Sequence, residues 1–162
     1  METGSCSRMI VSSPVFIEDG PIPPQYTADG EGINPPLVID GVPDGTITMA
    51  LIMEDPDAPH GTVTHWVLWD ITPLNSISED SEPGVSGLNT VGKTGYLPPN
   101  PANGSHRYYF HLYALDASLD LQTGSSREEL EGAMKGHVMA AGTMMGRYEK
   151  AKDRERVGTA RG

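Results

Sequence analysis

Residues 46–71, TITMALIMEDPDAPHGTVTHWVLWDI, decide the fold class of this chain. Segments 46–54 and 62–71 are rich in β-branched and aromatic residues, and the turn-forming letters DPDAPHG separate them, so we predict two strands. A third strand is predicted over 107–115, RYYFHLYAL. Because strands follow one another without intervening helices, antiparallel β-sheets are favoured over an alternating α/β fold.

Three weaker strands and one helix complete the predicted elements. Apolar and β-branched clusters predict short strands at 9–11, 37–40 and 137–148. Ser126 and Glu129 have the spacing of a capping box, so a helix is predicted to begin there. Nineteen glycines and 14 prolines among 162 residues favour many short strands joined by turns. The sequence thus predicts a mainly β fold with one or two peripheral helices.

Length, charge and hydropathy restrict the class of protein. A chain of 162 residues with 37% apolar residues fits one domain, predicted over 1–162. Eleven Lys and Arg against 22 Asp and Glu give a net charge of −11, which argues against a nucleic-acid partner. No apolar run approaches the roughly 20 residues that span a bilayer, and we identify no secretion signal. We therefore expect a cytoplasmic protein without stable membrane insertion.

The two ends of the chain carry little information about function. Cys6 is the single cysteine, so no intrachain disulfide is possible, and we expect a structural thiol. The N-terminus and the basic tail 151–162 are expected to be flexible.

Residues 87–94, GLNTVGKT, match the phosphate-loop pattern letter for letter. Such a loop works between a buried strand and the N-terminus of a helix, whose amides hold the phosphates. Here polar residues precede the match, and Pro98, Pro99 and Pro101 prevent a helix after it. We therefore reject nucleotide binding at this loop.

Two carboxylates lie in the turn between the first two predicted strands. Pro56 and Pro59 restrict the backbone on either side of Asp57, so the turn should hold Asp55 and Asp57 in fixed positions. A stiff turn of this kind is typical of a site that uses its geometry. The alternative is a rigid turn with solvated acids.

Histidines on the strands supply the second group of candidates. Period-two alternation assigns residues of 62–71 to two faces: His65, Val67 and Trp69 on one, and Trp66, Leu68 and Asp70 on the other. On the third strand His106 and Tyr108 share a face, whereas His111 points the other way. No zinc motif is present, so a metal held by Asp55, His65 and His106 would depend on the tertiary fold.

These motifs together resemble one known family. The letters DPDAP at 55–59, HW at 65–66, and GLNTVGKTGY…GSHRY within 87–108 are similar to those of the phosphatidylethanolamine-binding protein family, in its prokaryotic Raf-kinase-inhibitor-like branch. The resemblance covers about 16–150. It implies a large central antiparallel sheet packed on a smaller one, a sandwich-like arrangement, with peripheral helices and a small anion pocket at one end.

The resemblance also implies a ligand and the residues that bind it, namely Asp55, Asp57, His65, His106 and Tyr108. Two imidazoles and a phenol can donate hydrogen bonds to a phosphate or phosphoethanolamine-like anion, and an aspartate can orient a histidine or receive an ammonium group. Arg107 would face away and be structural. No cofactor or metal is expected.

By resemblance we expect a protein that binds a small anion or a phospholipid head group, that regulates an unidentified protein partner such as a kinase or protease, and that forms a homodimer. One alternative is an enzyme that acts on a phosphoester with His65 or His106 as general base. Another is an interaction protein with a vestigial pocket. The family's Gly-Gly-Pro is here Leu97-Pro98-Pro99, and its later Pro-Pro ends in Ala102, so the pocket rim should be reshaped.

Overall fold

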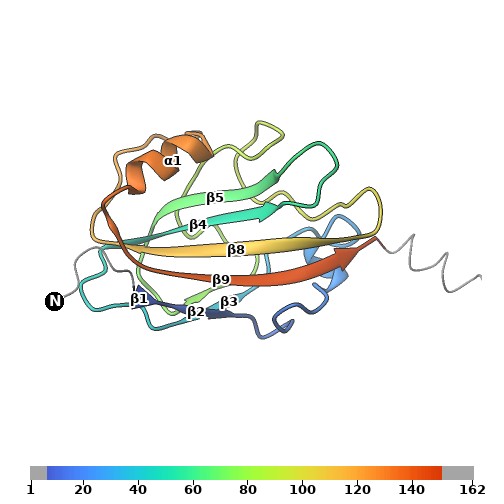
Figure 1. Ribbon diagram of the computed structural model, residues 1–162, viewed down its shortest axis with the longest axis horizontal. Helices are drawn as coiled ribbons and strands as arrows, with labels where there is room; N and C mark the ends of the chain where they lie inside the picture. The colour runs from blue at the N-terminus through green and yellow to red at the C-terminus, as the bar shows by residue number, and fades with distance from the viewer. Residues whose placement is uncertain (1–6, 151–162) are drawn as a thin grey trace, which may run out of the picture.

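Two β-sheets and one α-helix make up residues 7–150, the part of the chain that the computed structural model describes (Figure 1). The large sheet has the strand order β1 (Ser7–Arg8), β9 (Val138–Glu149), β8 (Ser105–Leu115), β4 (Thr48–Asp55), β5 (Val63–Ile71) and β7 (Val85–Ser86). The small sheet has the order β2 (Ile10–Ser12), β3 (Leu37–Asp40) and β6 (Ser76–Ile77). A 3-10 turn, η1 (Pro24–Tyr26), and helix α1 (Arg127–Met134) complete the elements.

The predicted mainly β class is confirmed, and the strands predicted over 46–54, 62–71 and 107–115 are present as β4, β5 and β8. The sheets are antiparallel as predicted except at one edge of the large sheet, where β1 pairs with β9 in parallel. The chain changes sheets directly after this pair. Met9 donates its N–H to the carbonyl of Ala141 in β9, and the following residues, β2, pair with β3 of the small sheet. Cys6 and the tail 151–162 lie outside the described residues.

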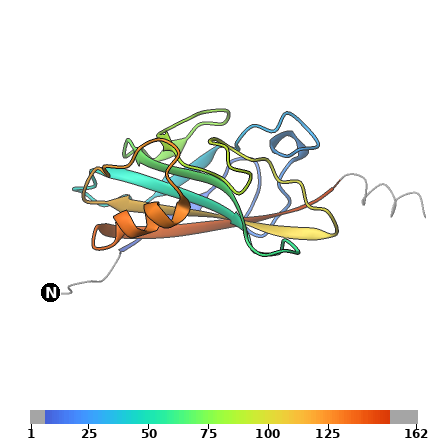
Figure 2. The ribbon, with the colours of Figure 1, turned by 90° about the horizontal axis from the view of Figure 1, so that it is seen from above.

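The apolar side chains form one cluster on each face of the large sheet. The cluster between the two sheets includes Leu51, Trp66, Phe110 and Met144 from the large sheet and Val11, Ile39 and Ile77 from the small one. The cluster under the helix includes Ile52, Val67, Trp69, Leu130 and Met134. Figure 2 shows helix α1 and the blue loops that follow β2 on opposite sides of the large sheet. The architecture is therefore three layers, with the large sheet in the middle.

Helix α1 begins at the predicted capping box. The Ser126 hydroxyl accepts the N–H of Glu129, and the Glu129 carboxylate accepts the N–H of Ser126. Leu130 and Met134 are buried one turn apart, so the helix rests on the large sheet. No helix within 7–150 has the length and apolar character needed to cross a bilayer.

A β-bulge interrupts the pairing of β4 with β5. Met53 pairs with Trp66, but the next residue, Glu54, pairs with Thr64. His65 is therefore an extra residue on β5, and a bulge re-aims the side chain at such a position.

The predicted faces of β5 are correct for residues 66–69, whose side chains alternate between the two apolar clusters. They are wrong for His65 and Asp70, on either side of this segment. His65 lies against Tyr108, with ring centroids 5.3 Å apart, on the face opposite to the one predicted. Asp70 has φ of 53° near a second register shift and accepts the N–H of Leu119 on the helix side. The prediction is wrong for these residues because strict period-two alternation ignores bulges.

Candidate functional site

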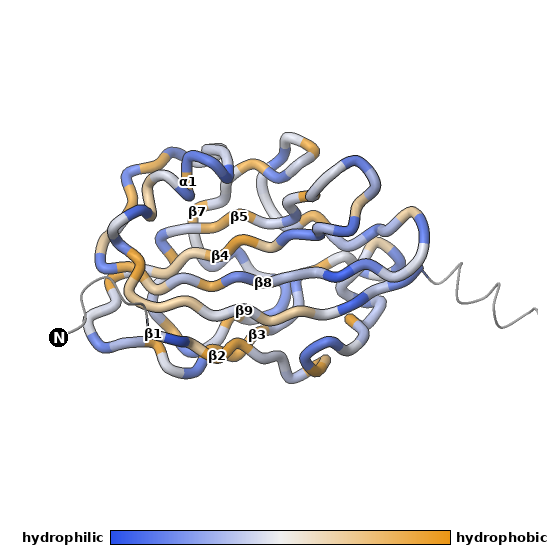
Figure 3. The backbone as a smooth tube through the Cα atoms, in the orientation of Figure 1, coloured by the Kyte–Doolittle hydropathy of each residue, from blue (hydrophilic) through white to orange (hydrophobic). Residues whose placement is uncertain are grey.

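Polar side chains from three strands meet at one end of the large sheet. Asp55 ends β4, His65 lies near the start of β5, and His106 and Tyr108 lie near the start of β8. Figure 3 shows that β4, β8 and β9 turn hydrophilic toward this same end. The four side chains, together with Asn100, form the polar part of a cavity of about 290 Å³. The structure thus brings together four of the five predicted site residues.

Asp55 and His106 form a buried pair in this cavity. The Nδ1 atom of His106 donates to Oδ2 of Asp55 at 2.6 Å, and the two side chains are 8% and 4% exposed. The other oxygen, Oδ1, accepts the backbone N–H of Asp57 at 2.8 Å. Both oxygens of Asp55 are therefore engaged, and His106 keeps only Nε2 for a further hydrogen bond.

His65 is fixed by the loop that passes over it. Its Nδ1 atom lies 2.7 Å from the carbonyl oxygen of Leu97, and the N–H of Leu97 donates back to the carbonyl of His65. Since a carbonyl oxygen only accepts, Nδ1 carries the proton. Burial lowers the pKa of His65, against the opposing effects of the Leu97 carbonyl and the Asp55 charge. The imidazole is thus neutral near pH 7, with Nε2 as an acceptor.

Tyr108 lies between the two imidazoles and is fully buried. The ring of His65 meets it edge-on, and the ring of His106 stacks on it with centroids 6.4 Å apart. Burial raises the pKa of Tyr108 far above its usual value, and the charges of Asp55 and Asp57 add to this effect. The phenol therefore stays protonated, yet its hydroxyl has no hydrogen-bond partner within residues 7–150.

Asp57, the fifth predicted site residue, does not line the cavity. Its carboxylate accepts the backbone N–H, Nε and Nη2 of Arg107 at 2.8, 2.9 and 2.8 Å. Hydrogen bonds from the Arg107 side chain are the main cause that lowers the pKa of Asp57 to about 2. This contact ties the turn to β8 and so holds Asp55 beside His106. Arg107 has the structural position that the resemblance implies.

The loop at 87–94 uses its own polar groups internally. The side-chain oxygen of Asn89 accepts the backbone N–H groups of Val91 and Lys93. The backbone N–H of Asn89 donates to the carbonyl of Lys93. The segment that follows forms no helix. The amides that a phosphate loop would offer are therefore already bonded.

Metal binding finds no support in the part of the chain that the structure describes. Between residues 7 and 150, no three His, Cys, Asp or Glu side chains are grouped so that they could hold a metal ion.

Sequence reasoning named part of the cavity wall, the rim at Leu97-Pro98-Pro99 and Ala102, but not the part that comes from 58–63 or from Val91. This wall consists of uncharged side chains from residues 58–63 and from the loop 91–102. The available signal was the run LPPNP at 97–101, which lies close in sequence to His106. How such a loop folds over a strand depends on tertiary contacts, here the two hydrogen bonds between Leu97 and His65.

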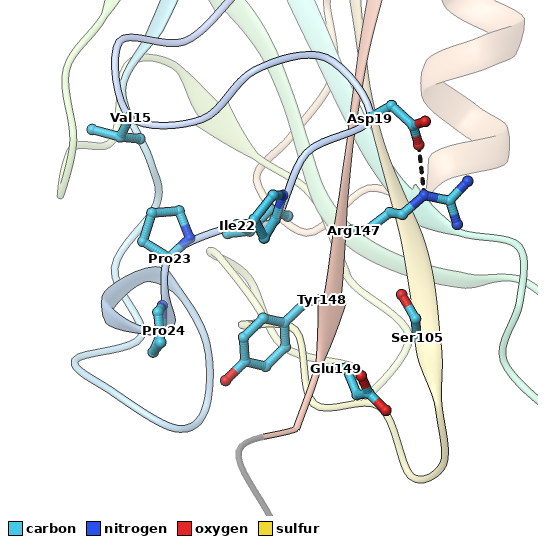
Figure 4. A pocket seen from close by; sticks show the side chains of 10 residues that line it. Val15, Asp19, Ile22, Pro23, Pro24, Ser105, Arg147, Tyr148 and Glu149 are labelled. Atoms are coloured by element: carbon cyan, nitrogen blue, oxygen red, sulfur yellow. Dashed lines mark hydrogen bonds and ion pairs between the residues drawn. The ribbon is translucent and has the colours of Figure 1, made fainter. Parts of the chain in front are cut away.

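A larger hollow of about 650 Å³ lies beside the end of β9 (Figure 4). Pro23, Pro24 and the ring of Tyr148 form much of its lining in that view. The charged side chains of Asp19 and Arg147 at its edge pair with each other. Its lining within the described residues is mostly apolar and, unlike that of the smaller cavity, contains no imidazole.

Comparison with known proteins agrees with this geometry. Residues 12–149 match the family model described as phosphatidylethanolamine-binding protein. A UPF0098 protein of Methanothermobacter thermautotrophicus is 43% identical over 150 residues, which cover 88% of this chain and 99% of the relative. A UPF0098 protein of Pyrococcus horikoshii is 44% identical over 149 residues, covering 85% of this chain and 75% of the relative.

Solved structures give the same result. A phosphatidylethanolamine-binding protein homologue from Chlamydia trachomatis superposes with a TM-score of 0.86 at 40% identity, covering 89% of this chain and 99% of the homologue. The E. coli protein YbcL, described as a member of the mammalian family, shares the fold with a TM-score of 0.80 at 23% identity, covering 89% and 99%. Because a family model and relatives of this identity span most of its length, the chain belongs to the phosphatidylethanolamine-binding protein family.

Proposed function

We propose that the protein binds a small phosphorylated anion through the Tyr108 hydroxyl and the Nε2 atoms of His65 and His106. The observation that carries the proposal is the buried Tyr108 hydroxyl, which has no partner within residues 7–150. Leaving a buried donor unpaired costs roughly 1–3 kcal/mol. Within residues 7–150 the other unpaired buried side-chain group is the indole N–H of Trp69, in the apolar cluster under the helix, whereas the Tyr108 hydroxyl lines a cavity together with two imidazoles. An anionic oxygen is the acceptor that this donor lacks.

The protonation state of His65 and His106 determines whether their Nε2 atoms can donate a hydrogen bond to an anion. Each Nδ1 atom donates to a fixed acceptor, so a neutral ring offers only a lone pair at Nε2. An anion binds there when the ring is protonated, or when the anion itself carries a proton, as a phosphate ester does near its second pKa of about 6. Binding should therefore take up a proton and strengthen as the pH falls from 7.5 to 6.0.

Three potential donors in one cavity favour phosphate over carboxylate. A phosphate group offers at least three peripheral oxygens and about two negative charges, whereas a carboxylate offers two oxygens and one charge. We expect phosphate to bind more tightly than acetate at both pH values.

The test is a calorimetric and thermal-shift titration with phosphate, phosphoethanolamine and acetate at pH 6.0 and 7.5. We expect phosphate to raise the melting temperature with a larger effect at pH 6.0, and acetate to have little effect. If no anion shifts the melting temperature at either pH, the pocket is vestigial and the proposal fails.

A second function, hydrolysis of a phosphoester, is favoured by the Asp55–His106 pair. A carboxylate on Nδ1 orients an imidazole so that Nε2 can act as a general base. However, no Ser, Thr, Cys or Lys side chain is among those lining the cavity. We therefore propose binding without turnover. Release of p-nitrophenol from p-nitrophenyl phosphate, abolished in His106→Ala, would establish the enzyme instead.

Assembly and regulation are separate proposals. We infer a homodimer and an unidentified protein partner that this protein regulates, both from the family resemblance. Light scattering coupled to size exclusion tests the first, since a dimer has twice the chain mass of 17.4 kDa. A mass of one chain at micromolar concentration would contradict it.

A further inference from the structure

The anion pocket has more room than a phosphate ion fills. Its volume of about 290 Å³ corresponds to roughly ten water molecules at about 30 Å³ each. A phosphate ion, with one phosphorus and four oxygen atoms, occupies only part of this space. The wall of the cavity must therefore contact the organic group of a phosphate ester, and its chemistry decides which ester fits.

One side of this wall comes from the turn after β4. Ala58, Pro59 and Val63 line the cavity there, and none carries a polar side chain. The acid of the same turn, Asp57, is held by Arg107 outside the cavity. This side therefore offers the ligand apolar surface only.

Another part of the wall comes from the loop that covers His65. Its apolar lining residues are Val91, Leu97, Pro98, Pro101 and Ala102. The prolines have no N–H to donate, so the backbone there is poor in donors. Val91 is 57% exposed at the edge of the cavity, where a ligand would cover it.

The lining that the structure describes has few negatively charged acceptors for a cation. Asp55 is the one acidic residue in it, and its two oxygens already accept from His106 and from the N–H of Asp57. Apart from the three anchor residues His65, His106 and Tyr108, the remaining polar residue is Asn100, whose amide is neutral. An ammonium group would therefore lose part of its hydration without gaining a carboxylate partner, which is unfavourable.

We propose that this pocket selects phosphate monoesters whose organic group is uncharged and apolar, and disfavours an ammonium group such as that of phosphoethanolamine. The inference rests on the proposed function, since the phosphate anchors the ligand through His65, His106 and Tyr108. It assigns specificity to the wall residues, chiefly Val91, Leu97 and Ala102.

Propyl phosphate and phosphoethanolamine are the matched probes. They have the same phosphate and the same number of heavy atoms, and differ in a terminal methyl against a terminal ammonium. Titration calorimetry at pH 7.5 should give about tenfold tighter binding of propyl phosphate. The net charge of −11 attracts the ammonium at long range, so general electrostatics predicts the opposite order.

Two variants test whether the wall causes the preference. Ala102→Asp places a carboxylate at the exposed edge of the cavity. It should reduce or reverse the preference for propyl phosphate over phosphoethanolamine, measured as the ratio of their dissociation constants. Asn103→Asp adds the same charge one residue away, outside the lining, and should leave the ratio unchanged.

The outcomes separate this inference from the proposed function. If inorganic phosphate and both esters fail to bind, the proposed function is wrong and the inference falls with it. If phosphate binds but phosphoethanolamine equals or exceeds propyl phosphate, the anion site stands and the apolar specificity is overturned. An unchanged ratio in Ala102→Asp, or an equal change in Asn103→Asp, would show that the wall does not set the preference.

Discussion

The two faces of strand β8 differ in how completely their polar groups are paired. On the helix side, Arg107, Tyr109 and His111 all hydrogen-bond to other side chains. On the cavity side, His106 keeps Nε2 unpaired and Tyr108 its hydroxyl, within residues 7–150. Neighbouring residues of one strand thus differ in role, and the unpaired Tyr108 hydroxyl between two imidazoles, rather than the density of charge, marks the candidate site.

The helix-side face shows what a saturated polar surface does. Glu54 accepts from Nε2 of His111 at 2.8 Å and from Arg127 of α1 at 2.7 Å, and Nδ1 of His111 lies 2.9 Å from the hydroxyl of Thr143. Burial raises the pKa of Glu54, but hydrogen bonds from His111 and Arg127 outweigh it, so the pKa lies below its ordinary value. This network fastens the helix to the sheet and leaves little for a ligand to bind.

The largest expected effect is on the free energy of unfolding, and it should differ between Asp55 on the cavity side and Asp57, which binds Arg107 outside the cavity. Asp55→Ala should lower the free energy of unfolding by about 3 kcal/mol, because a buried acceptor of two hydrogen bonds is lost. Asp57→Ala should lower it by about 1 kcal/mol, since its pair with Arg107 is 27% and 39% exposed. Urea denaturation measures both values. Equal losses would contradict the assignment of Asp55 as the buried anchor.

The two histidines of β8 should separate binding from stability. His106→Ala removes Nε2 from the cavity and should weaken phosphate binding at least tenfold at pH 6.0. His111→Ala removes an imidazole of the same strand that is bonded to Glu54 and Thr143, and should leave phosphate binding unchanged. Calorimetry on both variants checks this, with circular dichroism as the control for folding. Similar weakening in both would mean that phosphate binds outside the cavity.

The strands and the helix could be predicted because their signals are local. Alternation and β-branched residues mark β4, β5 and β8, and the capping box marks the start of α1. Strands β6 and β7 have two residues each, too few for any periodic pattern. The strand predicted at 9–11 falls where the chain passes from β1 in the large sheet to β2 in the small one, a change of sheet that only the path of the chain determines.

The site could be predicted in composition and only partly in geometry. The motifs led to Asp55, His106 and Tyr108, which the structure places together. The side chain of His65 reaches the same cavity only because a bulge in the pairing with β4 re-aims it, and a register shift depends on the partner strand. Asp57 leaves the site because Arg107, 50 residues away, binds it. Contacts at such separations have no signature in a single strand.

The pH dependence of stability should report on the cavity side. The pKa of His65 is lowered in the folded state, so below about 6.5 the unfolded chain takes up a proton more readily, and stability falls as the pH decreases. In His65→Asn the amide can still donate to Leu97, but nothing titrates. From pH 7.5 to 5.5 the melting temperature of the wild type should therefore fall further than that of the variant. Parallel curves would mean that His65 does not carry this linkage.

Phosphate should oppose this decline, because it favours the protonated imidazole that the empty cavity disfavours. With saturating phosphate, the wild-type melting temperature should depend less on pH between 7.5 and 5.5. A phosphate effect of equal size in His65→Asn would assign the proton uptake to another group.

Substitution of Tyr108 and of Tyr109 by Phe should give the smallest effects. One should change phosphate binding and the other the free energy of unfolding. Tyr108→Phe removes a hydroxyl that has no partner within residues 7–150, so the free energy of unfolding should stay the same or rise by up to about 1 kcal/mol. Phosphate binding should weaken about fivefold, because a donor to the anion is lost. Tyr109→Phe removes the acceptor of the Arg107 guanidinium at 3.2 Å. It should cost about 0.5 kcal/mol and leave binding unchanged.

Urea denaturation and phosphate calorimetry give the free energy of unfolding and the phosphate affinity of each variant. We expect Tyr108→Phe to lose affinity but not stability, and Tyr109→Phe to lose stability but not affinity. A substitution on the cavity side that weakens binding without lowering stability, beside one that does the reverse, cannot arise from general damage to β8. If Tyr108→Phe instead loses stability and keeps its affinity, the hydroxyl has a structural partner in solution, and the cavity side of β8 is as saturated as the helix side.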